Sequence, residues 1–251
     1  MPEVLVAGGW GLLAGSALVV GALAGYLARI PGVVVAGVMA FGSGVLLSAV
    51  SFELIAEAHE RGGLLPTAGG AVAGAVVYTL ANIALARRGA RHRKRSGDQQ
   101  PSESEQSGSG TAIALGALLD GVPESIVIGA SLLGGGGVSV VTVAAVFVSN
   151  VPEGLSSASG MRNAGRSRRY VFTLWGGIAV ASALAAMAGY GVLGGAPGEV
   201  LAAITALAGG AILAMVADTM IPEAFSDARL WTGLITVTGF LTAFWLSSLQ
   251  A

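Results

Sequence analysis

The chain contains no cysteine and only two histidines in 251 residues. The absence of thiols excludes disulfides and thiolate metal sites. Charged residues make up 11% of the sequence and aromatic residues 6%. Because a soluble domain carries about 25% charged residues, this shortage of charge indicates a protein built for a lipid bilayer.

Several functional classes lack their signature motifs. There is no G-x-x-x-x-G-K-[ST] phosphate loop and no H-E-x-x-H zinc motif. An aspartic protease within the membrane needs two facing aspartates, and the motifs around Asp120 and Asp218 do not support one. The net charge is −1, and no basic face with interleaved aromatic residues is present. We therefore expect no enzymatic activity, no cofactor and no nucleic-acid partner.

Apolar residues and glycine are abundant. Hydrophobic residues make up 54% of the chain, the mean hydropathy is +0.77, and 40 residues are glycine. The usual glycine content is about 7%. Small residues allow the backbones of membrane helices to approach closely. This composition predicts a bundle of closely packed transmembrane helices.

A transmembrane helix needs about 20 apolar residues, and the sequence predicts eight of them. They cover residues 5–28, 33–56, 64–86, 111–133, 138–160, 171–193, 200–224 and 231–249. The first is expected to be a span rather than a cleaved signal, because no basic segment precedes it. The chain 1–251 is expected to form one all-α integral membrane domain. Only the connection 87–110 is long, and its polar, Ser- and Gln-rich composition predicts a disordered basic loop.

Basic residues predict the orientation. With both termini outside, twelve of the 13 Lys and Arg residues fall on the inner side, and only Arg61 lies outside. The twelve are Arg29, Arg87, Arg88, Arg91, Arg93, Lys94, Arg95, Arg162, Arg166, Arg168, Arg169 and Arg229. Lys and Arg favour the cytoplasmic side of a membrane. The loop 87–110 is therefore predicted to be cytoplasmic, and the protein to be a multi-pass protein of the plasma or inner membrane.

The sequence repeats itself at an offset of 166 residues. Segments 40–58 and 206–224 share seven of 19 residues without gaps, including Glu57 and Glu223. The offset relates the first three spans to the last three, which run in opposite directions. We therefore predict an inverted repeat of three helices, a central pair and three helices. Secondary transporters often have this plan, with the substrate site near the midplane.

The central pair of spans carries two related motifs, LDGVPESIVIG at 119–129 and VSNVPEGLSSA at 148–158. In each, a proline that bends a helix precedes a glutamate that is costly in lipid. Asp120 and Glu124 are four residues apart and share a helix face, as do Ser149 and Glu153. Asn150 lies three residues before Glu153. These five residues are the candidate cation ligands, and Pro123, Pro152 and Pro222 are the expected helix kinks.

Four further acids are predicted to line a path through the membrane. Glu53 and Glu57 belong to the outer end of the second span, and Asp218 and Glu223 to the inner end of the seventh. The predicted topology puts no basic residue inside the membrane. We therefore expect these acids to be protonated or to bind cations from solution, with no salt bridge to neutralise them.

Simpler explanations exist for each residue. A protonated Glu124 or Glu153 could hydrogen-bond a neighbouring helix, and Glu57 and Glu223 could be solvated helix ends. Asp120, Ser149 and Asn150 could be structural.

The two Pro-Glu helices within an eight-span repeat resemble the ZIP family of divalent metal transporters. That family carries His-Asn-x-Pro-Glu-Gly in its fourth span, where this chain has residues 120–125, and a related motif in the fifth. The family histidines are replaced by Asp120 and Ser149, and the family asparagine by Gly121. The resemblance implies metal ligation by Asp120, Glu124, Ser149, Asn150 and Glu153, at one central site.

The resemblance implies a permease that carries divalent cations such as zinc, manganese or iron by alternating access. An all-oxygen site favours harder ions than a site with imidazole. Small-residue faces and the family make a homodimer plausible. The loss of every motif histidine leaves an alternative open, a proton-coupled transporter of a non-metal solute.

Overall fold

The computed structural model describes residues 2–134 and 138–249, and these residues form helices and connections with no strand. The elements, in chain order, are α1 (Glu3–Leu27), α2 (Gly32–Ala49), η1 (Val50–Ile55), α3 (Ala56–Gly62), α4 (Leu64–Leu85), η2 (Ala86–Ala90), α5 (Ser109–Ser131), η3 (Leu132–Gly134), α6 (Val140–Asn163), α7 (Arg168–Leu193), α8 (Gly198–Met215), η4 (Val216–Met220), α9 (Ile221–Ala228), η5 (Arg229–Trp231) and α10 (Thr232–Ser248).

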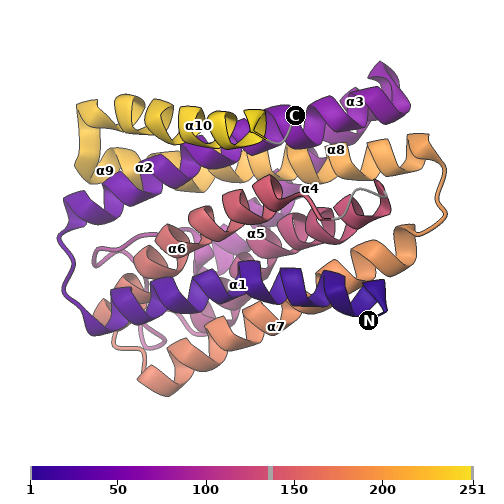
Figure 1. Ribbon diagram of the computed structural model, residues 1–251. Coiled ribbons are helices and arrows are strands. Elements are labelled where there is room, and N and C mark those ends of the chain that lie inside the picture. The colour runs from indigo at the N-terminus through magenta and orange to yellow at the C-terminus, as the bar shows by residue number, and fades with distance from the viewer. Residues whose placement is uncertain (1, 135–137, 250–251) are drawn as a thin grey trace.

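Seven helical stretches of the described residues are long and apolar enough to cross a membrane. The last, Gly198–Ser248, contains 51 residues. It changes direction at Arg229, whose φ is 47°, and α10 turns back alongside α2 (Figure 1). Large apolar side chains face outward, including Leu65, which is 83% exposed, and Val192, which is 78% exposed. The prediction of an all-α fold is confirmed for the described residues. The long apolar helices are consistent with a membrane protein, because helices satisfy their own backbone hydrogen bonds in lipid.

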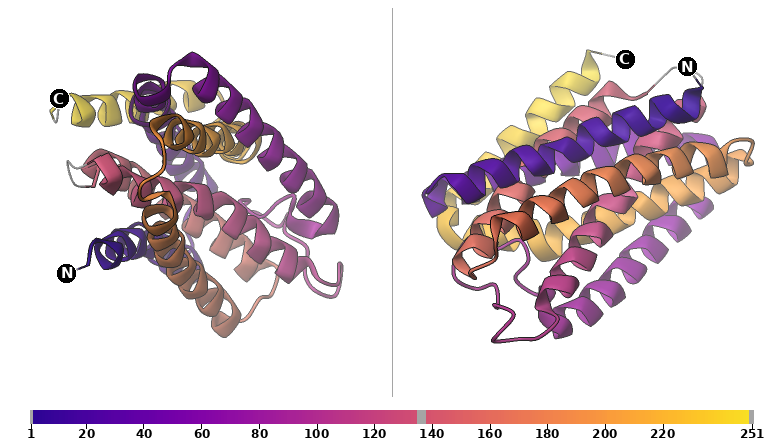
Figure 2. Two further views of the ribbon diagram at one scale, coloured as in Figure 1. Left: turned by 90° about the vertical axis from the view of Figure 1, so that its right-hand side faces the viewer. Right: turned by 90° about the horizontal axis from the view of Figure 1, so that it is seen from below.

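The connections gather at the two ends of the bundle. Figure 1 shows the α1–α2, α6–α7 and α9–α10 connections at one end, here called the loop end. The α7–α8 connection lies at the other end, towards which α1 begins and α10 ends (Figure 2). The long connection 91–108 also lies at the loop end.

The internal repeat, whose two copies are 166 residues apart in the sequence, is visible in the helix boundaries. Adding 166 to the bounds of α2, 32 and 49, gives 198 and 215, the bounds of α8. The same offset takes η1, which begins at 50, to η4, which begins at 216. The packing repeats as well, since α2 packs on α10 as α8 packs on α4, and α1 packs on α6 as α7 packs on α5. The two halves therefore make equivalent contacts.

Glycine permits the closest of these contacts. A Cβ on Gly44 of α2 would collide with the carbonyl oxygen of Thr236 in α10. Its repeat partner Gly210 (44 + 166) faces the carbonyl of Ala71 in α4 in the same way. Backbones in such contact pack through van der Waals forces, which hold helices together where lipid weakens the hydrophobic effect.

A π-helical segment interrupts both long helices at equivalent positions, in η1 and η4. Such segments are rare and are frequently found at functional sites. Pro222, one of the expected helix kinks, is the second residue after η4, but its repeat equivalent is Ala56. Proline therefore does not by itself explain the π geometry. The other two expected kinks, Pro123 and Pro152, lie inside the unbroken helices α5 and α6.

Candidate functional site: a buried network of charges

Six charged side chains are buried among the described residues, and all of them except Glu124 are joined in one network of ion pairs and hydrogen bonds. The six are Arg93, Lys94, Asp120, Glu124, Glu153 and Glu223. The acids lie on α5, α6 and α9, and the cations lie on the connection 91–108. The rest of the buried surface is apolar or uncharged, so the charges of the bundle interior are concentrated at one place.

Asp120 lies at the centre of α5, eleven residues from each end. Its two carboxylate oxygens accept hydrogen bonds of 2.9 Å from Nε and Nη2 of Arg93. The hydroxyl of Tyr78 donates a further bond of 2.8 Å. A guanidinium that binds a carboxylate through two nitrogens is among the strongest polar pairings in proteins. The Arg93 guanidinium is therefore a built-in counterion for the Asp120 carboxyl.

Arg93 reaches this depth because the chain reverses direction after α4. Gly89 in η2 has a φ of 101°, a backbone geometry that L residues with a side chain rarely adopt. The turn directs the following residues back into the bundle. There Arg93 also donates 2.8 Å and 2.9 Å bonds to Asn82 Oδ1 and Tyr78 Oη, so α4 and α5 are joined through one guanidinium.

Lys94 connects the two motif helices. Its Nζ lies 2.8 Å from Oε2 of Glu153 on α6 and 3.4 Å from Oδ2 of Asp120 on α5. The Lys94 side chain is only 3% exposed. The hydroxyl of Ser156 donates to the Lys94 carbonyl. A cation thus occupies the position between the two carboxylates that the sequence motifs singled out.

Glu223 extends the network towards the loop end. Its Oε2 lies 3.1 Å from Nη1 of Arg95, and its Oε1 accepts bonds of 2.9 Å and 3.0 Å from the backbone nitrogen and hydroxyl of Ser96. The Ser156 hydroxyl also lies 3.0 Å from Oε1 and shares its single hydrogen between this oxygen and the Lys94 carbonyl. Arg95 also bonds the carbonyl of Pro222 at 2.9 Å. Three consecutive basic residues therefore each hold at least one buried acid.

Glu124 differs from its neighbours. It lies one turn after Asp120 and is 2% exposed, yet no hydrogen bond or ion pair of its carboxyl is found among the described residues. Arg93 and Lys94 pair with Asp120 and Glu153 and leave Glu124 as a third buried carboxyl without an ion pair among the described residues. The third carboxyl is the group to which a further cation or a proton can be added.

Ser149 and Asn150 are buried, and their side chains donate hydrogen bonds to backbone carbonyls rather than to the acids. The hydroxyl of Ser149 donates to the carbonyl of Val146 at 3.0 Å, and the amide of Asn150 donates to the carbonyl of Ala14 at 3.0 Å. The second bond fixes α6 to α1. Across residues 2–134 and 138–249, no group of three or more His, Cys, Asp or Glu side chains has the arrangement of a metal site. The observed state is one in which nitrogen cations hold the carboxylates.

The four predicted path acids are not brought together. Only Glu223 joins the network. Glu53 lies at the opposite end, where Ser247 and Ser139 donate hydrogen bonds of 2.5 Å and 3.3 Å to it. Glu57 pairs with Arg61 one turn later, and Asp218 is exposed.

The expectation that no salt bridge neutralises the buried acids is wrong. The sequence predicts that Arg93 and Lys94 lie in a disordered loop, because residues 87–110 are polar and of low complexity. In the structure, part of that loop packs inside the bundle. The signal that could have indicated this is Gly89 directly before a run of basic residues, since a glycine turn can direct a chain backwards and three cations match three carboxyls.

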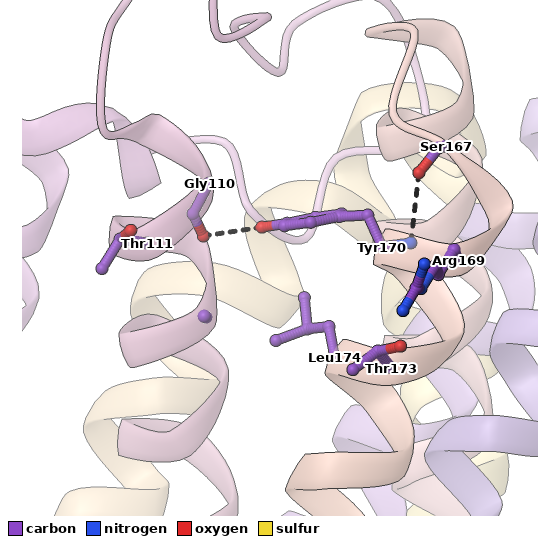
Figure 3. A pocket seen from close by; sticks show the side chains of 8 residues that line it. Gly110, Thr111, Ser167, Arg169, Tyr170, Thr173 and Leu174 are labelled. Atoms are coloured by element: carbon purple, nitrogen blue, oxygen red, sulfur yellow. Dashed lines mark hydrogen bonds between the residues drawn. The ribbon is translucent and has the colours of Figure 1, made fainter.

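An open pocket of about 520 Å³ lies apart from this network, between α5 and α7 at the loop end (Figure 3). The side chain of Tyr170 extends across the pocket, and its hydroxyl donates a 2.8 Å bond to the carbonyl of Gly110. Ser167 caps α7 by accepting a bond from the backbone nitrogen of Tyr170. The pocket is lined by Gly110, Thr111, Ala114, Ser167, Arg169, Tyr170, Thr173 and Leu174. None of these is acidic, so the pocket offers no cation site.

A comparison with known protein families finds no match, and a search of curated proteins finds none either.

Proposed function

We propose that the protein is a secondary carrier of divalent cations. It would have eight spans, counting the two legs of Gly198–Ser248 separately, with both termini outside. The substrate would bind between α5 and α6, with Asp120 and Glu153 as its principal ligands and Glu124 as the third carboxyl. Ser149 and Asn150 would contribute their free oxygen atoms after a local rearrangement.

The observation that carries this proposal is the position of the Lys94 ammonium. It lies between carboxylates from two helices, near the middle of each. Among the described residues, the other buried charges are members of the same network or the neighbouring Glu124. Each charged residue at the centre of a membrane helix costs about 2.5–3.5 kcal/mol on insertion scales. A charge of this cost is seldom retained without a function, and the position of the Lys94 ammonium supports a cation site there.

The chemistry of the donors suggests which cations bind. Every side-chain ligand is a carboxylate, an amide or a hydroxyl oxygen, and such ligands suit manganese and magnesium. Zinc also accepts Asp and Glu oxygens. The resemblance of the Pro-Glu motifs to the ZIP family supports the same class of substrate.

The repeated halves support alternating access. Inverted repeats allow a carrier to exchange the conformations of its two halves around a central site. The equivalent packing of α2 with α10 and of α8 with α4 provides two such halves, and the π-helical segments η1 and η4 occupy equivalent places at which the long helices can bend.

Uptake by reconstituted protein tests this function. Replacing Glu153 by glutamine should reduce manganese or zinc uptake into proteoliposomes to the background of empty vesicles, because one of two principal ligands is lost. Glu105→Gln is the matched control, since Glu105 is an exposed acid of the connection 91–108. Uptake by Glu153→Gln equal to that of the control would contradict the assignment of the site.

A second candidate, a transporter of organic cations, is favoured by one observation. The groups that now occupy the carboxylates are an ammonium and a guanidinium, and organic amines and guanidines present the same groups. A thermal-shift screen separates the two functions. A metal carrier should be stabilised by submillimolar manganese or zinc, whereas an organic-cation carrier should respond to small amines or guanidines and not to the metals.

A further inference from the structure

The segment Arg93–Ser96, here called the tether, fills the space that the proposed substrate needs. Lys94 bridges Asp120 and Glu153, while Arg95 and Ser96 cover Glu223 on the side of the loop end. Gln100 holds the segment on its other side, because its side-chain nitrogen lies 3.0–3.1 Å from the carbonyl oxygens of Arg93, Arg95 and Ser157 and shares its two hydrogens among them. An ion between α5 and α6 and the Lys94 ammonium cannot occupy the same position.

We propose that the tether is a built-in competitor of the substrate, which closes the loop end of the path and sets the charge that an incoming cation must carry. This inference rests on the proposed function and adds a specificity-determining residue, Lys94, to it. A divalent ion brings two positive charges to the carboxylates from which it displaces one ammonium. A monovalent ion carries the same single charge as the Lys94 ammonium that it would displace. It would therefore gain no electrostatic advantage to offset the loss of its own hydration shell.

The way in which the tether is held makes it displaceable. Residues 91–108 contain no aliphatic or aromatic apolar side chain other than Pro101. Ion pairs and hydrogen bonds, rather than apolar burial, therefore hold the tether in place. The ion pairs among them are lost when another cation neutralises the same carboxylates, whereas buried apolar contacts would persist. Exposed residues 97–99 follow the tether and supply slack for its release.

The far end of the connection stays anchored when the tether leaves. Glu103 pairs with Arg166 at 2.7 Å. Hydrogen bonds from Arg166 and from the backbone nitrogens of Gly108 and Gly110 lower the pKa of Glu103 to about 2. This anchor is therefore charged throughout the physiological pH range. It limits the distance over which the tether can move and keeps it close enough to return.

Binding of manganese to the purified full-length protein tests the proposal. Lys94→Gln should bind manganese about tenfold or more tightly than the wild type, because a buried ion pair that competes with the ion is removed. Arg91→Gln is the matched control, since Arg91 is an exposed cation of the same connection. The wild type and Arg91→Gln should bind with the same affinity.

The outcomes separate the two proposals. If the wild type binds manganese and Lys94→Gln binds it no more tightly, the tether proposal is overturned and the carrier proposal stands. If neither protein binds manganese or zinc, both are overturned.

A second measurement tests the tether without the Lys94→Gln variant and applies if that variant does not fold. Because the natural chain has no cysteine, Ser157→Cys would provide a single thiol beneath Gln100, at a position only 2% exposed. In otherwise wild-type protein, manganese should accelerate its labelling by a water-soluble maleimide several-fold, whereas sodium at the same ionic strength should not. Labelling that is unchanged by manganese would overturn the tether.

Discussion

At the scale of single residues, the molecule places compensated charges in an apolar interior. Two of the three basic residues in the sequence Arg93-Lys94-Arg95 are almost fully buried, and each of the three pairs with an acid from a different helix or helix pair. Removing one member of a buried pair is expensive, because the other charge is left without a partner. The stability of the bundle is therefore linked to the occupation of these carboxylates by cations.

Arg93 should be the most sensitive member. Arg93→Gln leaves Asp120 without its bidentate partner, so we expect a loss of about 3–5 kcal/mol in the free energy of unfolding. Arg95→Gln should cost clearly less, because the Arg95 side chain is 23% exposed. Chemical denaturation in detergent measures both values. The double variant Arg93→Gln/Asp120→Asn, which removes both charges, should recover much of the loss. Equal stability of the two single variants would contradict this account.

The sequence pointed to the buried acids of the charged cluster but not to their partners. The paired Pro-Glu motifs pointed to Asp120, Glu124 and Glu153, since a carboxyl within an apolar run stands out in composition and spacing. Arg93 and Lys94 were not recognised, because a polar segment of low complexity has no periodicity that reports burial. Their placement depends on a chain reversal at Gly89 and on carboxylates that lie 27 and 59 residues further along the chain.

At the scale of helices, close packing depends on glycine at a few crossing points. Gly74 of α4 lies against the carbonyl of Leu207 in α8, the contact equivalent to that of Gly239 in α10 with Phe41 in α2. These contacts hold together the helices that the 166-residue repeat relates. The sequence repeat of seven matches in 19 positions therefore predicted an equivalence that extends to helix boundaries and packing, although the π-helical segments had no visible signal.

A pair of substitutions in α4 tests the role of this contact. Gly74→Val should destabilise the protein by about 1–3 kcal/mol, because the added side chain forces α4 and α8 apart. Gly69→Val in the same helix is the control, since a Cβ at Gly69 meets no atom within 4 Å. Thermal unfolding in detergent measures the difference. If Gly69→Val lowers the melting temperature as much as Gly74→Val, helix propensity rather than packing sets the cost.

At the scale of the whole molecule, the fold combines an apolar exterior, two equivalent halves and one charged interior site. The composition predicted the first, and the repeat indicated the second. The charged interior was predicted only in part. Its basic residues come from the connection 91–108 at the loop end, and the composition of that connection predicts disorder. The central claim is that α5 and α6 together form a cation site, now occupied by Lys94.

The most direct test is anomalous scattering from crystals of Lys94→Gln soaked in manganese, with wild-type crystals as the comparison. The account predicts a manganese peak in the variant between the carboxylates of Asp120 and Glu153, close to the position of the Lys94 ammonium, and a weaker peak or none there in the wild type. A variant that keeps these two carboxylates in place and shows manganese only at the protein surface would contradict it.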